Sequence, residues 1–88
     1  MNGIPSNISR GEVARRLGLP TDQLGSVNDP RTTEEHGVKW NEKWVYRDPE
    51  RDGFDRIVLW NRYDLLGMWR IARDGSATPE ALPDKAAH

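Results

Sequence analysis

No cysteine occurs among the 88 residues of this chain. That absence excludes disulfide bonds and thiolate metal sites, and it leaves the redox compartment unmarked. No apolar run approaches the length of a transmembrane helix, and no charged segment followed by an apolar one marks a signal peptide. We therefore expect a cytoplasmic protein that makes no membrane contact.

An excess of charge of one sign is also lacking. The chain has 13 basic and 14 acidic residues, so its net charge is −1 and no global basic field attracts nucleic acid. A DNA-binding domain of this size often carries a clear basic excess. The balance therefore counts against strong DNA binding by an isolated monomer, although it is compatible with a local basic stripe.

The chain has few of the groups that enzymes use. It holds two histidines, His36 and His88, and its isolated glycines form no phosphate-binding loop. Glu34, Glu35 and His36 offer oxygen and nitrogen ligands, but adjacent residues in a flexible loop rarely close a metal site. We predict a protein that is not an enzyme and that uses no cofactor or metal.

What is present is a helix-turn-helix spacing between Ser9 and Val27. A first helix and a short second helix, joined by a tight turn, each place apolar residues on one face. These residues are Val13, Ala14 and Leu17 in the first helix and Leu24 and Val27 in the second. Such a frame most often places its second helix in the major groove of DNA.

Local signals mark the ends of both helices. Ser9 is the expected N-cap of the first helix, and Glu12 completes a capping box. Gly18 is expected to end that helix in the left-handed conformation, and Thr21 to cap the second. We expect Gly18→Val to lower stability more than Gly25→Val, by about 1 kcal/mol, because a β-branched residue resists the left-handed conformation.

A β-hairpin is predicted in the middle of the chain. Residues 38–46 and 56–60 read as strands, residues 48–53 as the turn, and residues 28–37 as an exposed linker. If Trp40, Trp44 and Trp60 share one face of the hairpin, a helix could cover them. Three apolar residues would then occupy the opposite face: Val45, Ile57 and Leu59. An exposed apolar face of this kind predicts a homodimer or a protein partner.

The segment after Trp60 fits two structures. A helix capped by Asp64 would align Leu65, Met68, Trp69 and Ala72, and Asp74-Gly75 would stop it, so these signals favour helix. Alternation along the same residues instead predicts a third strand. Residues 76–88 read as a disordered tail and residues 1–8 as an N-terminal arm, which leaves residues 9–75 as the domain.

The order helix, turn, helix, hairpin, helix resembles the winged helix-turn-helix of the MerR and excisionase families. The resemblance covers Ser9–Val27 and, more loosely, Gly53–Gly75. Within the second range, Gly53-Phe54, Asp64-Leu65, Met68 and Ile71 resemble the wing and the helix that follows it. The resemblance implies that the second helix lies in the major groove and that the wing contacts the backbone or the minor groove.

We therefore expect a small α+β domain that acts as a non-enzymatic, DNA-associated regulator of transcription, of bacterial or phage type. By the resemblance, Thr21, Asp22, Gln23 and Ser26 would face bases. The cations expected at phosphates are Arg10, Arg15, Arg16, Lys39, Lys43 and Arg47. The alternative function is a small protein-interaction module, such as an inhibitor or an adaptor, that does not bind DNA.

Overall fold

The computed structural model describes residues 9–83, which form one short helix and seven β-strands. The elements are α1 (Arg10–Leu17), β1 (Asp22–Gly25), β2 (Thr33–Glu35), β3 (Val38–Trp40), β4 (Glu42–Tyr46), β5 (Asp55–Asn61), β6 (Asp64–Ile71) and β7 (Ala77–Glu80). Five strands pair antiparallel in the order β1-β4-β5-β6-β7, and β2 and β3 form a separate hairpin. The predicted α+β fold, with a helix-turn-helix, a hairpin and a C-terminal helix, is therefore wrong, since the domain is mainly β.

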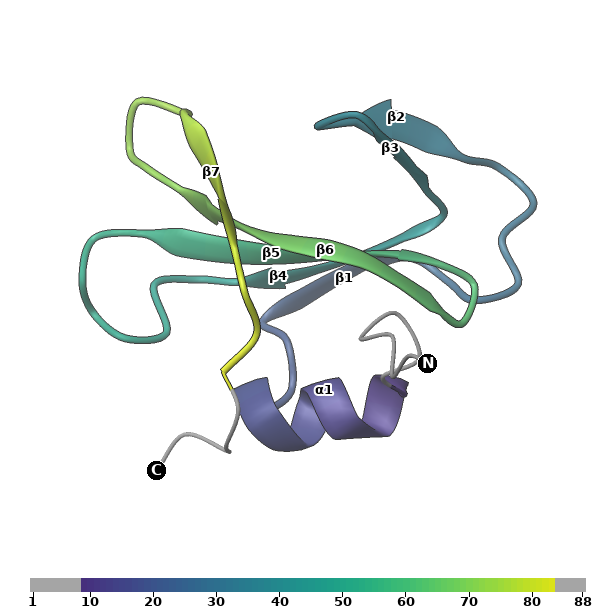
Figure 1. Ribbon diagram of the computed structural model, residues 1–88, viewed down its shortest axis with the longest axis horizontal. Coiled ribbons are helices and arrows are strands. Elements are labelled where there is room, and N and C mark those ends of the chain that lie inside the picture. The colour runs from purple at the N-terminus through teal and green to yellow at the C-terminus, as the bar shows by residue number, and fades with distance from the viewer. Residues whose placement is uncertain (1–8, 84–88) are drawn as a thin grey trace, which may run out of the picture.

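Two layers cover the sheet, one on each side (Figure 1). Helix α1 lies against one side, which we call the helix face, and the β2–β3 hairpin lies against the other, which we call the hairpin face. The buried residues of the helix-face core are Val13, Trp44, Tyr46, Val58, Trp60 and Met68. Those of the hairpin-face core are Val45, Ile57, Leu59 and Trp69. Alternation along β4 and β5 sends their side chains to the two faces in turn.

Helix α1 forms where it was predicted. The Ser9 hydroxyl accepts a hydrogen bond from the Glu12 amide at 3.1 Å, and Gly18, at a φ of +84°, ends the helix. The Glu12 carboxylate binds Arg15 and Arg16 in place of the expected return bond to Ser9. Val13 is fully buried and fixes the helix on the sheet. This helix is too short to cross a membrane, and the part of the chain with described structure contains no other.

The predicted second helix is a strand. Asp22–Gly25 forms β1, which pairs antiparallel with β4 and places Leu24 opposite Lys43. The segment is short and ends in Gly25, a poor helix former, so a helix there would gain little from propensity. Backbone pairing with β4 stabilises the extended form instead, beginning with a bond of 2.8 Å from the Thr21 amide to the Val45 carbonyl.

The predicted hairpin is present as β4 and β5, with register pairs such as Val45 and Ile57. Its expected first strand, residues 38–46, is divided at Asn41 into β3 and β4, which belong to different sheets. Trp44 and Trp60 share the helix face as expected, whereas Trp40 lies on β3 and packs into the hairpin face. The expected linker at residues 28–37 contains β2. The residues of β2 are all polar, so the sequence shows no hydrophobic pattern there, although two of their partners on β3 are Val38 and Trp40.

The segment after Trp60 is the third strand and not a helix. Strand β6 pairs with β5 on one side and with β7 on the other, so pairing on both sides outweighs the helical spacing. Gly67 suits this strand, because a Cβ there would lie 2.8 Å from the Trp69 ring. The folded unit extends beyond residue 75, since Ala77–Glu80 forms β7 within the predicted disordered tail. The predicted arm at residues 1–8 and the end of that tail, residues 84–88, lie outside the described residues.

Candidate functional site

The three residues predicted to form an exposed interface are core residues. Val45, Ile57 and Leu59 are 7%, 6% and 0% exposed. The β2–β3 hairpin packs Val38 and Trp40 against this face. The layer that covers these three residues therefore comes from the chain itself and not from a partner. The prediction of an exposed apolar face here is wrong, because Val38 and Trp40, which were expected in the first strand of the hairpin, form the separate strand β3 and pack on this face.

Arg10, one of the cations predicted to bind DNA, is instead the partner of a buried carboxylate. Its guanidinium bonds both oxygens of the fully buried Glu42, at 2.5 and 2.8 Å. The Trp44 indole N–H donates to Glu42 at 2.8 Å, and the Gln23 amide also donates to it. Burial alone would raise the pKa of Glu42, but these hydrogen bonds hold it below the ordinary value. The arrangement ties α1 and β1 to β4.

Most of the remaining cations proposed for phosphate contacts also pair with carboxylates. Arg15 and Arg16 contact Glu12 at 2.6 and 2.7 Å and lower its pKa to about 2. The other contacts are Lys43 to Glu35 at 2.9 Å, and Arg47 to Asp22 at 3.2 Å and to Asp55 at 3.4 Å. Lys39 is exposed and makes no ion pair within residues 9–83. A phosphate would have to compete with these carboxylates.

The residues predicted to face bases lie on or beside β1. The Thr21 hydroxyl accepts a bond from the Arg47 amide at 3.2 Å, and the Gln23 amide is engaged by Glu42. The Ser26 carbonyl accepts from the Asp29 amide at 3.1 Å in the loop that follows. They are not presented on a helix, so the predicted base-reading surface does not form.

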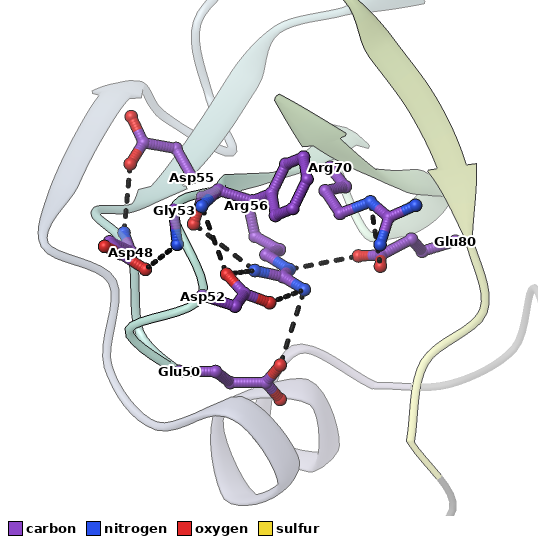
Figure 2. A network of polar contacts seen from close by, with 9 residues as sticks. Asp48, Glu50, Asp52, Gly53, Asp55, Arg56, Arg70 and Glu80 are labelled. Carbon is purple, nitrogen blue, oxygen red and sulfur yellow. Dashed lines mark hydrogen bonds and ion pairs between the residues drawn. The ribbon is translucent and has the colours of Figure 1, made fainter. Parts of the chain in front are cut away.

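A second network lies beyond the C-terminal end of α1, around Arg56 (Figure 2). This arginine is nearly buried, and it contacts three carboxylates. Asp52 takes two bonds at 2.8 and 2.9 Å, Glu80 one at 3.2 Å and Glu50 one at 3.4 Å. A fifth bond, at 3.3 Å, goes to the Phe54 carbonyl. Because a guanidinium has five N–H donors, Arg56 has no donor left for a ligand.

A cavity of about 340 Å³ adjoins this network. Leu17, Met68 and Pro49 give it apolar walls, and Tyr46 adds a hydroxyl that donates to the Gly18 carbonyl at 3.0 Å. Burial raises the pKa of Tyr46 to about 12, so the hydroxyl stays protonated. Because all Arg56 donors already bind groups of the protein, the role of the network is structural: it joins the β4–β5 loop to β7.

Sequence reasoning missed both Glu42 and Arg56. Each is a charged residue inside or beside an apolar strand, and that position was the available signal. Their partners are remote: Arg10 lies 32 positions from Glu42 and Glu80 lies 24 from Arg56. Pairings at such separations cannot be read from spacing along one element.

The hairpin face carries a different hollow, of about 280 Å³. Its apolar lining comes from four strands: Leu24, Val45, Ile57 and Ile71. Its polar and charged lining comes from Glu35, His36, Lys43, Arg47 and Asp55. The apolar and the polar lining residues lie on the hairpin face. On the same face the His36 ring stacks on Trp69, with ring centroids 5.3 Å apart. The hollow reaches β1 through Leu24, which is 49% exposed.

Strand β1 is itself an open edge of the sheet. It pairs with β4 on one side and, among residues 9–83, with no strand on the other. All residues from Thr21 to Ser26 are exposed. In an antiparallel edge strand, alternate residues direct their N–H and C=O groups away from the sheet. Such groups can bind another extended backbone.

Comparison with protein-family models, with curated proteins and with solved structures found no significant match to this chain. The resemblance to the MerR and excisionase families therefore stays a prediction. Within residues 9–83, no group of three or more histidine, aspartate or glutamate side chains is placed to hold a metal ion.

Proposed function

We propose that this chain is a protein-interaction module that binds an extended segment of a partner along the open edge of β1. The observation that carries the proposal is the exposed, unpaired side of that strand. Addition of a strand to a sheet edge is a common mode of peptide recognition, in which main-chain hydrogen bonds provide affinity. The alternative function from the sequence analysis is thus the one that the geometry favours.

The two edges of the sheet differ in a way that favours β1. Strand β7, at the opposite edge, contains Pro79, which has no N–H and weakens that edge as a template for pairing. Strand β1 has no proline, and it carries Leu24, a large apolar side chain that is exposed. A partner strand at β1 would cover apolar surface as well as backbone.

The alternative of DNA binding has less support. Five of the six cations assigned to phosphates contact carboxylates, which leaves Lys39. The segment expected to enter the major groove is the four-residue strand β1. Loss of the helix removes the element that would carry base contacts in a helix-turn-helix protein. Both observations weigh against DNA as the main partner.

The experiment uses random linear peptides displayed as a library, because the natural partner is not identified. Binders selected against the protein are synthesised with a single N-methyl group at each position in turn. Pairing along β1 predicts a loss of roughly tenfold or more in affinity at alternate positions, since every second peptide N–H donates to the edge strand. Intervening positions serve as controls within the same peptide. Equal sensitivity at all positions, or failure to select any binder, would contradict the proposal.

A further inference from the structure

The hollow on the hairpin face begins at the edge that the partner is proposed to occupy. Leu24 belongs to β1 and also lines the hollow, together with Val45, Ile57 and Ile71. Residues directly opposite each other in an antiparallel pair point to the same face, with Cβ atoms about 5 Å apart. The residue of an added strand that lies opposite Leu24 would therefore stand at the mouth of this hollow.

The charges around the hollow are already paired with one another. Glu35 contacts Lys43 at 2.9 Å and His36 at 3.6 Å. On the β1 side, Arg47 contacts Asp55 at 3.4 Å and is also held by the neighbouring Asp22. A charged ligand group would have to disrupt these pairs, whereas the apolar floor has no competing occupant within residues 9–83. The chemistry that fits the hollow is an uncharged, apolar side chain.

We propose that the hollow is the specificity pocket of the β1 site and that it receives one large apolar side chain of the partner segment, at the position opposite Leu24. This inference rests on the function proposed above and adds the chemistry of the partner. Main-chain pairing accepts almost any sequence, so a pocket for one alternate side chain is what would select among extended segments.

The test compares two leucine variants with a selected peptide as the probe. Leu24→Ser removes the pocket wall, and Leu19→Ser is the matched control, because Leu19 is 84% exposed and does not line the hollow. Isothermal titration calorimetry should show roughly tenfold weaker binding to Leu24→Ser, equivalent to about 1.4 kcal/mol, and unchanged binding to Leu19→Ser. Thermal unfolding of both variants checks that the fold is retained.

A substitution in the peptide keeps the test independent of the fold of the variant. Replacing the apolar peptide residue opposite Leu24 by serine should weaken binding to the wild-type protein and leave little difference between wild type and Leu24→Ser. If both leucine variants bind like wild type while N-methylation still acts at alternate positions, the pocket is refuted and the edge-strand function stands. If N-methylation has no alternating effect, the function itself is refuted.

Discussion

Glu42 shows how a single residue fixes the positions of α1 and β1 on the sheet. Its buried carboxylate joins Arg10 of α1 to Gln23 of β1, and the Arg10 guanidinium lies 5.3 Å from the ring centroids of both Trp44 and Trp60. Removing one partner of such a buried pair leaves a charge without compensation. The open edge of β1 is therefore held in place from the helix face.

We predict that Glu42→Gln lowers the free energy of unfolding by about 3 kcal/mol at neutral pH. The folded-state pKa of Glu42 lies below its ordinary value of 4.5, so its stabilising effect is fully present above that value. It is lost as the pH falls through the lowered pKa. The difference in urea-unfolding stability between the two proteins should therefore shrink below about pH 4.5.

Glu34→Gln is the matched control, because Glu34 is exposed on β2. It should change stability by less than about 0.5 kcal/mol at every pH. A Glu42→Gln protein as stable as wild type at pH 7, or a difference that grows on acidification, would show that the buried carboxylate does not hold β1 and α1 together.

Among the elements, those with strong local signals were predicted and those that depend on remote pairing were not. The sequence predicts the caps of α1 at Ser9 and Gly18, and its alternation predicts the strands β4 and β5. The structure confirms these elements. The residues of β1 fit a helical face, so their spacing predicts a helix, whereas the partners that make them a strand lie on β4, about twenty positions along the chain. Strand β6 fits both periods, so only its neighbours decide its structure.

The same limit applies to the candidate site. The edge of β1 could not be predicted while Asp22–Gly25 was read as a helix, because an edge exists only once the order of strands is known. The hairpin-face hollow depends on the β2–β3 hairpin, and the polar residues of β2 give no hydrophobic pattern from which to predict it. Val45, Ile57 and Leu59 were correctly placed on one face, but their covering layer was not recognised.

Gly25 offers a test of β1 as a strand. The sequence alone favours Gly18 as the more sensitive glycine, but a Cβ at Gly25 would lie 2.1 Å from the Asn41 carbonyl oxygen. A Cβ at Gly18 would meet nothing within 4 Å, and both glycines have positive φ values. We therefore predict that Gly25→Ala lowers the free energy of unfolding more than Gly18→Ala, by about 2 kcal/mol. Chemical denaturation of both variants measures the difference, and the reverse order would argue against the close approach of β1 to β4.

In the domain formed by residues 9–83, one edge of the sheet is open and the other is interrupted by proline. Both faces of the sheet are covered, one by α1 and one by the β2–β3 hairpin (Figure 1). Charges of both signs pair across the surface, which leaves little basic field for nucleic acid. The exposed backbone of β1 lies next to an apolar hollow. Together they are the feature that best supports binding of an extended partner segment.

Backbone amide hydrogen exchange of the full chain can show whether a partner segment pairs with β1. Exchange is measured for the protein by itself, with a selected peptide, and with random duplex DNA at low salt. The peptide should slow exchange of alternate amides in Asp22–Gly25, and DNA should leave these amides unchanged. Protection by the peptide that spares β1, or protection by DNA centred on this segment, would contradict the proposed function.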